Sequence, residues 1–112
     1  MALIDEIESR YSGRRTEIEV PEWGSSDGEP LVLYAKPYTI ADERYLKRWV
    51  DKDSSEGYAE ICVRKLEDFE GRPCFQAADR VTLVQRSDAH VVKRVAMLIM
   101  TSSPSVEEAS GN

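Results

Sequence analysis

Apolar positions near the start of the chain repeat with a helical period. Leu3, Ile7 and Tyr11 are spaced four residues apart, and Ile4 extends the same face. Acidic residues lie at the N-terminal end of this segment, where the helix dipole favours them. The spacing predicts an amphipathic helix over residues 2–11. Because so short a helix is marginal in isolation, we expect it to dock either on the body of the protein or on a partner.

The pattern then changes to the alternation typical of β-strands, in residues 16–23 and 31–38. One face of each segment is apolar, and these faces carry Ile18, Val20, Leu31, Leu33 and Ala35. Between the segments, Asp27-Gly28 is suited to a tight turn. We therefore predict one antiparallel β-hairpin over about 16–38. An isolated hairpin is marginally stable, so it needs a helix or a third strand packed beneath it.

Helical spacing returns after Thr39 and predicts about four further helices. They cover residues 40–50, 56–67, 79–86 and 89–101. Thr39 is expected to cap the first of them by accepting a hydrogen bond from the backbone N–H of Asp42. Six apolar residues of these helices are expected to share one core: Leu46, Trp49, Val63, Leu66, Val95 and Ile99.

The segment from Asp68 to Phe75 predicts a loop between two of these helices. Gly71 and Pro73 favour a tight turn within it. Phe69 and Phe75 flank the turn, and we expect both rings to hold the loop against the core.

The last helix is apolar over more of its circumference than one docking face requires. Its apolar residues are Val91, Val92, Val95, Ala96, Met97, Leu98, Ile99 and Met100. Part of this surface is therefore a candidate for contact with another chain, and methionine suits adaptable contacts. The candidate partner-binding residues are Val91, Met97, Leu98 and Met100, together with Leu3 and Ile7 of the first helix.

Together these elements predict an α+β fold: an N-terminal helix, one hairpin and about four packed helices. The chain of 112 residues has the length of a single domain, which we place at residues 1–101. Residues 102–112 are small, polar and acidic, a composition that predicts a disordered tail.

Charge is distributed unevenly along the chain, which carries a net −6. Residues 1–30 hold eight acids and three bases, residues 31–101 hold eleven acids and twelve bases, and the rest hold two acids. No basic stripe is present to neutralise phosphates, so neither nucleic acid nor an anionic membrane is an expected partner. No apolar run approaches the roughly 20 residues of a membrane span, and the first residues lack a secretory signal pattern. We expect a cytoplasmic protein.

Residue types that carry catalysis or metal binding are scarce and scattered. His90 is the single histidine and has no partner at ligand spacing. Cys62 and Cys74 do not form a disulfide framework, and Cys62 falls at an expected core position. No phosphate-binding or nucleophile motif occurs, and the carboxylates lie on solvated helix faces. We therefore expect no catalytic, cofactor or metal site, and a protein that is not an enzyme.

Several segments, taken in order, resemble the tail assembly chaperones of long-tailed phages and related prophages. The segments are EVPEWG at 19–24, PYTIADER at 37–44, GRPCF at 71–75 and SVEEA at 105–109. The resemblance spans nearly the whole chain and depends on the order and spacing of the motifs, each of which is weak alone. Cys74 stands where the family has an aliphatic residue, and the chain departs from the family pattern at its Ala-Ser-Gly-Asn end.

The resemblance implies a non-enzymatic assembly factor in the host bacterial cytoplasm. Such a protein would bind the tape-measure protein, keep its apolar helical segments from aggregating, recruit tail-tube subunits and be absent from the mature virion. Self-association through the same apolar surface is a further expectation. Two alternatives stay open: a structural tail or head–tail connector component, and a small protein-binding regulatory module.

Overall fold

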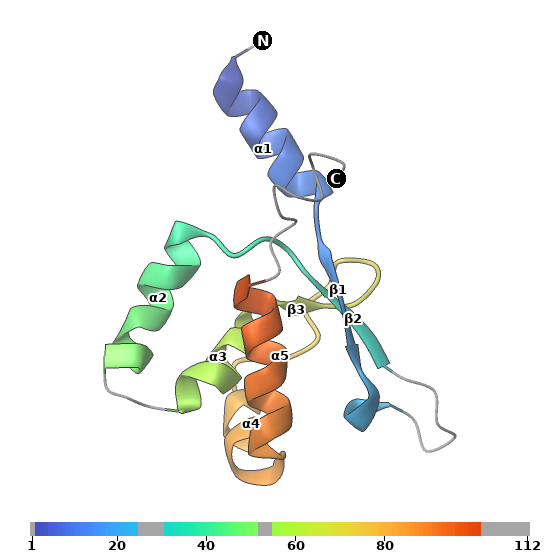
Figure 1. The fold of residues 1–112 in the computed structure, drawn as a ribbon, viewed down its shortest axis with the longest axis vertical. Coiled ribbons are helices and arrows are strands. Elements are labelled where there is room, and N and C mark those ends of the chain that lie inside the picture. The colour runs from blue at the N-terminus through green and yellow to red at the C-terminus, as the bar shows by residue number, and fades with distance from the viewer. Residues whose placement is uncertain (1, 25–30, 52–54, 102–112) are drawn as a thin grey trace.

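The computed structural model describes residues 2–24, 31–51 and 55–101, and these residues form an α+β fold. The elements in chain order are α1 (Leu3–Gly13), β1 (Thr16–Val20), the 3-10 helix η1 (Pro21–Trp23), β2 (Leu31–Ala35), α2 (Ile40–Asp51), α3 (Glu56–Lys65), β3 (Leu66–Glu67), α4 (Asp79–Arg86) and α5 (Ala89–Thr101). The sheet lies on one side of the body and helices α2 to α5 on the other (Figure 1). The predicted fold class is confirmed. The predicted turn at Asp27-Gly28 and the predicted tail over 102–112 lie outside the described residues.

The sheet is antiparallel and has the order β1-β2-β3. Its hairpin register pairs Thr16 with Ala35 and Val20 with Leu31, so the predicted hairpin is confirmed. β1 ends at Val20 because Pro21, which has no N–H to give to a ladder, begins η1 instead. β2 ends at Ala35, earlier than the predicted residue 38.

The third strand corrects the sequence prediction, which placed residues 66 and 67 in a helix. Leu66 and Glu67 instead pair with Ala35 and Tyr34 of β2. The backbone carbonyl of Leu66 also accepts a hydrogen bond of 3.1 Å from the N–H of Cys74. Leu66 is buried as a strand residue, and the predicted helix also placed it on an apolar face, so apolar spacing could not distinguish a helix end from a strand. These pairings give the hairpin the third strand that its stability requires.

The core lies between the inner face of the sheet and the helices. α5 packs against β1 on one side and α3 on the other. Its buried side chains are those of Val91, Val92, Val95, Ala96 and Ile99. Among the six residues predicted to share a core, Leu46, Leu66, Val95 and Ile99 are buried, whereas Trp49 and Val63 are half-buried at its edge. The predicted core is therefore largely confirmed.

A buried ion pair fixes α2 against α3. Thr39 and Asp42 exchange two hydrogen bonds of 3.0 Å, which confirms the predicted cap and makes it reciprocal. The Asp42 carboxylate also lies 2.7 Å from the Lys65 ammonium and 2.8 Å from Arg64 Nε. Lys65 in turn donates to the carbonyl of Pro37 over 3.2 Å. Burial alone would raise the pKa of Asp42, but hydrogen bonds from Lys65, Thr39 and Arg64 outweigh it and lower this pKa to about 2.

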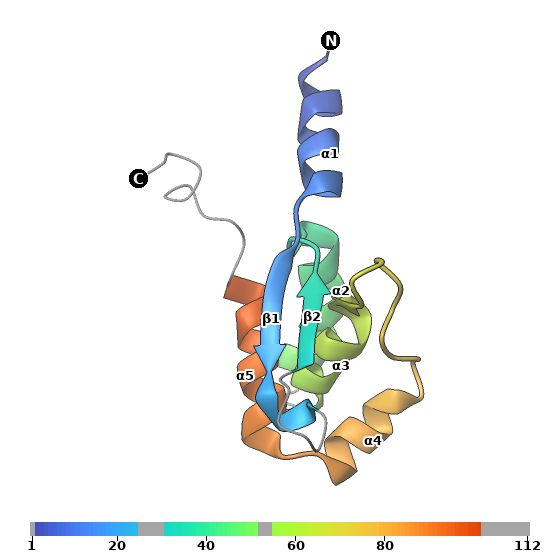
Figure 2. The same cartoon turned by 90° about the vertical axis from the view of Figure 1, so that its right-hand side faces the viewer.

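The two phenylalanines that flank the loop after β3 have different surroundings. Phe75 is half-buried and packs edge-on against Trp23, with ring centroids 6.1 Å apart. Phe69 is 68% exposed and contacts Tyr34, on the face of the sheet away from the helices. The prediction that Phe69 holds the loop against the core is therefore wrong. Figure 2 shows this open face of β1 and β2, with the helices behind them.

Candidate functional site

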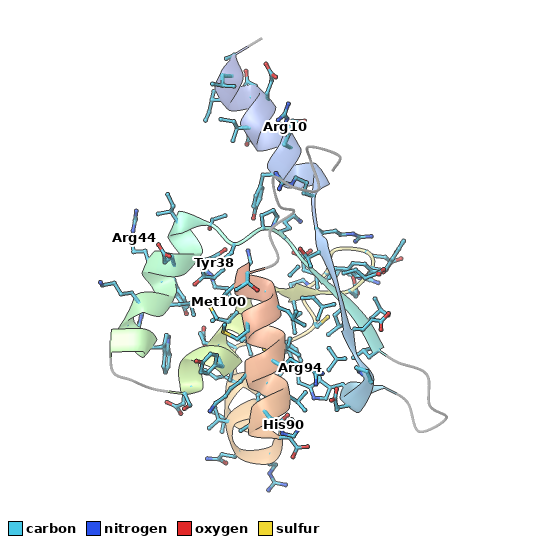
Figure 3. All side chains as sticks on the ribbon, viewed as in Figure 1. Arg10, Tyr38, Arg44, His90, Arg94 and Met100 are labelled. Carbon is cyan, nitrogen blue, oxygen red and sulfur yellow. The ribbon has the colours of Figure 1, made fainter. Side chains whose placement is uncertain are left out.

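Helix α1 extends away from the body of the protein. It buries none of its side chains, and Leu3, Ile4 and Ile7 are 70, 67 and 53% exposed. Both views show the helix projecting beyond the sheet at one end of the molecule (Figures 1 and 2). In Figure 3 the side chains of α1, including Arg10, surround the helix with no other described element alongside. The sequence left open whether this helix docks on the body or on a partner; here it does not dock on the described body.

Contacts of Arg15 anchor the connection between α1 and the sheet. Arg15 donates a hydrogen bond of 2.6 Å to the carbonyl of Phe69. Its guanidinium also lies 4.1 Å from the ring centroid of Tyr34 and 4.8 Å from that of Phe69. These contacts hold the start of β1 against the loop after β3. They involve no residue of the apolar face of α1.

Helix α5 exposes less apolar surface than its sequence predicted. Val91 is 1% exposed and belongs to the core, so its assignment to a partner-binding surface is wrong. Met97 and Leu98 are 47 and 38% exposed, and Met100 is half-buried against the core. The wide apolar circumference is explained by two intramolecular faces, because β1 and α3 cover different sides of this helix. Of the candidate residues, those left at the surface are Leu3, Ile7, Met97 and Leu98.

An apolar groove that the sequence did not reveal lies between α3, α4 and α5. Its volume is about 140 Å³. Its lining residues are Ser55, Glu56, Tyr58, Ala59, Leu83, Val84, Ser87, Ala89, Val92 and Lys93. We call this feature the α3–α4–α5 groove. Val84, which is 40% exposed, opens it to the surface. The sequence signal was the presence of apolar residues on more than one side of α4, but only the crossing of three helices makes a groove.

The groove and α1 lie at opposite ends of the molecule. In Figures 1 and 2, α4 and the adjoining ends of α3 and α5 lie at the bottom of the body, and α1 lies at the top. Residues of α1 carry three acids and one base, a net −2. The stretch 79–101, which contains α4 and α5, carries two acids and four bases, a net +2. Two of these four bases are already paired with acids outside the stretch, Arg80 with Glu56 and Glu60 and Arg94 with Glu22, and the groove lining itself holds one acid and one base, Glu56 and Lys93.

An ion pair of partly exposed side chains joins two elements of the body. Glu22 and Arg94 make two hydrogen bonds of 2.6 and 2.7 Å that join η1 to α5, and the bond from Arg94 lowers the pKa of Glu22 to about 2. Figure 3 shows Arg94 on the side of α5 that faces η1, with His90 near the start of the same helix.

Cysteine chemistry is also suppressed. Burial raises the pKa of the Cys62 thiol to about 12, which leaves it protonated and unreactive. Burial likewise raises the pKa of Cys74, and neighbouring carboxylates add to this shift. Across the described ranges, no cluster of three or more potential metal ligands is found. In the same part of the chain, no helix is long and apolar enough to cross a membrane.

Comparison with known proteins adds no relative: no family model, curated protein or solved structure matches the chain. Three features of the structure are candidate binding surfaces: helix α1, which buries none of its side chains, the exposed pair Met97 and Leu98, and the α3–α4–α5 groove.

Proposed function

We propose that the protein is a tail assembly chaperone of a long-tailed phage or prophage, which binds the tape-measure protein through helix α1. The proposal includes recruitment of tail-tube subunits, action in the host cytoplasm and absence from the finished particle. One observation carries it: α1 presents an apolar face that no described part of the body covers. The ordered motifs of the sequence give this binding surface its proposed client.

The physical case begins with the length of α1. A helix of 11 residues has little stability of its own in water. Formation of the first turn is unfavourable, and a short helix has too few further backbone hydrogen bonds to offset that free energy. Contact with another apolar surface would stabilise it. Full burial of a leucine or isoleucine side chain contributes about 1.5–3 kcal/mol. Three such residues therefore give at most roughly 5–9 kcal/mol, before the cost of ordering the helix and immobilising the partner.

The chemistry of the surface favours an apolar helical client. Leu3 and Ile7 are one helical turn apart on α1, with Ile4 beside them, which is the spacing used in helix-on-helix recognition. Met97 and Leu98 provide a second exposed apolar contact on the body. A tape-measure protein is expected to offer long apolar helical segments. Acidic residues beside the apolar face would keep the free chaperone charged while it exposes that face.

Co-purification tests the proposal. The protein would be co-expressed with the tape-measure protein encoded in the same phage or prophage genome, and the captured tape-measure protein would be quantified. Ile7→Glu places a charge on the apolar face of α1, and we expect it to reduce capture at least about tenfold. Ser9→Glu is the matched control, because it adds the same charge on the opposite side of the same helix. Capture by this control should equal that of the parent.

The same experiment identifies the outcomes that contradict the proposal. Equal capture by the Ile7→Glu and Ser9→Glu variants would show that α1 is not the client contact. Failure of the parent to capture the tape-measure protein would reject the chaperone assignment. Detection of the protein in purified, finished tails would instead assign it to the structural tail or connector components.

A further inference from the structure

We propose that the outer edge of strand β1 binds an extended segment of a partner protein, which adds to the sheet as a fourth strand. The segment would carry basic residues on the outer face of the sheet and apolar residues on the side of α5. Three features support this: an edge that no described strand covers, an exposed leucine beside it, and two carboxylates that form no ion pair in the described part of the chain. The site lies on the body and is independent of the proposed function of α1.

Strand β1 pairs with a described strand on one side only. It is the first strand in the sheet order β1-β2-β3, and no strand among the described residues pairs with its other side. Successive residues of an antiparallel strand direct their N–H and C=O groups to opposite sides. Between Glu17 and Val20, every second residue therefore directs its backbone donor and acceptor away from β2. An edge of this kind can accept an extended peptide through backbone hydrogen bonds.

The inner side of this edge has an apolar floor. Helix α5 packs against β1, and Figure 2 shows part of α5 beyond the outer edge of the strand. Arg94 lies on the side of α5 turned toward the end of this strand, because it donates to Glu22 just after β1. Leu98 lies one helical turn further along the same side and is 38% exposed. An inward-facing apolar side chain of an added strand would cover Leu98.

The outer side of the edge is acidic. Glu17 and Glu19 are exposed there, and within the described ranges neither forms an ion pair. The residues opposite them on β2 are Tyr34 and Val32, which carry no charge. Side chains of opposite charge at directly opposed positions stabilise a strand pair. A strand with lysine or arginine opposite the two glutamates would therefore fit this face.

The cations closest in sequence to the hairpin ends have other contacts. Arg15 donates to the carbonyl of Phe69. The Lys36 ammonium lies 3.7 Å from the carboxylate of Glu67. The carboxylates of β1 therefore remain available to a basic partner.

Charge disfavours a second copy of β1 as the occupant. In an antiparallel pair of β1 strands centred on Ile18, Glu17 of one copy would lie opposite Glu19 of the other on the same face. Like charges at directly opposed positions destabilise a strand pair. The edge therefore favours a segment in which basic and apolar residues alternate.

An NMR titration of the full chain with synthetic seven-residue peptides tests the site. The probe alternates lysine and valine, so one of its faces is basic and the other apolar. We expect it to shift the amide resonances of residues 17–20 and of Leu98, and to protect alternate amides of β1 from hydrogen exchange. One control peptide has glutamate in place of lysine, and the other has every backbone nitrogen methylated. Each control should bind at least about tenfold more weakly. Methylation removes the backbone donors and keeps the charge, so it separates strand addition from charge attraction alone.

Charge reversal gives the most specific result. Glu17→Lys/Glu19→Lys should bind the lysine peptide at least about tenfold more weakly than the parent does, and the glutamate peptide at least about tenfold more tightly. Glu6→Lys/Glu8→Lys is the matched control, because it makes the same change of net charge on α1, which buries none of its side chains. At an ionic strength of about 0.15 M distant charges are screened, so this control should bind both peptides within about twofold of the parent.

A second pair of variants tests the apolar floor. Leu98→Ala shortens the side chain beside the edge and should weaken binding of the lysine peptide at least about threefold. Met97→Ala is the matched control, because Met97 is exposed on the same helix but lies on a side turned further from Arg94 and Leu98. This control should bind within about twofold of the parent. The amide spectra show whether each variant is folded.

Three results would overturn the proposal. The resonances of residues 17–20 could stay unchanged at lysine-peptide concentrations up to about 5 mM, where even weak binding is detectable. The methylated peptide could bind as tightly as the probe, which would indicate charge attraction without strand addition. Glu17→Lys/Glu19→Lys could keep the peptide preference of the parent, which would place the peptide elsewhere. Tape-measure capture is measured separately: a reversal of peptide preference with unchanged capture would support the strand site and leave the proposed function of α1 intact.

Discussion

The ammonium of Lys65 lies 2.7 Å from the carboxylate of Asp42 in the interior of the protein, where Asp42 and Lys65 are only 4 and 8% exposed. The pair joins the first turn of α2 to the last turn of α3. The Asp42 carboxylate also accepts a hydrogen bond from the backbone N–H of Thr39 at the start of α2. The same side chain therefore stabilises the N-terminus of α2 and holds this helix against α3. Charged groups are rarely buried unless they are paired, and here each residue of the pair neutralises the other.

Removal of one member of this pair should be strongly destabilising. We expect Asp42→Asn to lower the free energy of unfolding by about 3–5 kcal/mol, because it leaves the Lys65 charge buried without its partner. The double variant Asp42→Asn/Lys65→Met should lose less than the single variant, since the unpaired charge is then absent. Urea denaturation of the two variants and the parent measures both values. A double variant less stable than Asp42→Asn would contradict this interpretation.

The same pair predicts a loss of stability in acid. The pKa of Asp42 is lowered from 3.8 to about 2 in the folded protein. Its contribution to stability is therefore fully present above pH 3.8 and is lost as the pH falls toward 2. The size of this contribution is about 2 kcal/mol, at 1.36 kcal/mol per pKa unit. Asp42→Asn should have a shallower dependence of stability on pH in this window, and an equal slope for both proteins would argue against the assignment.

The residues of this pair also mark a limit of the sequence prediction. Apolar spacing located the five α-helices of the described residues and the hairpin, because the apolar faces of those elements repeat with their own period. It could not identify Lys65 as buried, because its partner lies in another helix and charged residues are usually solvated. β3 was missed for a related reason: two residues are too few to establish an alternating pattern.

The sequence likewise predicted some features of the candidate binding surfaces and not others. The amphipathic pattern of α1 predicted its helix and its apolar residues, but no local pattern could say whether the body would cover them. The breadth of α5 suggested a binding face, yet Val91 is buried because the fold covers this helix from two sides. The α3–α4–α5 groove depends on the packing of three helices, so the apolar residues on more than one side of α4 could not predict it by themselves.

Two glycines should respond in opposite ways to alanine. A Cβ added to Gly57 would lie 3.0 Å from the Cβ of Trp49, a contact so tight that Trp49 would have to shift by a few tenths of an ångström. We expect Gly57→Ala to destabilise the protein by about 1–3 kcal/mol. Gly13, at the end of α1, has open space around it. Its replacement by alanine should leave the unfolding of the body unchanged while raising the helical signal of α1. Urea denaturation and far-UV circular dichroism measure the two effects.

Substitution of a buried and of an exposed isoleucine should affect stability very differently. Ile99 is 3% exposed, and Ile99→Ala should cost about 2–5 kcal/mol of unfolding free energy, because it opens a cavity in the core. Ile7 is 53% exposed and α1 buries nothing, so Ile7→Ala should change stability by less than about 0.5 kcal/mol. Denaturation is measured at low protein concentration, so that self-association does not contribute to the unfolding free energy of either variant. A large loss of stability from Ile7→Ala would mean that α1 packs on the body.

Hydrogen exchange of the α1 amides tests the central claim most directly: that α1 lacks support within its own chain and is stabilised by a partner. In dilute, monomeric protein, the amides of residues 3–13 should exchange at nearly the rate of an unfolded peptide, while those of α5 are protected. Addition of the tape-measure protein should slow exchange in α1 at least about tenfold. Protection of α1 in the dilute monomer equal to that of α5, or exchange in α1 that the tape-measure protein does not slow, would contradict the account.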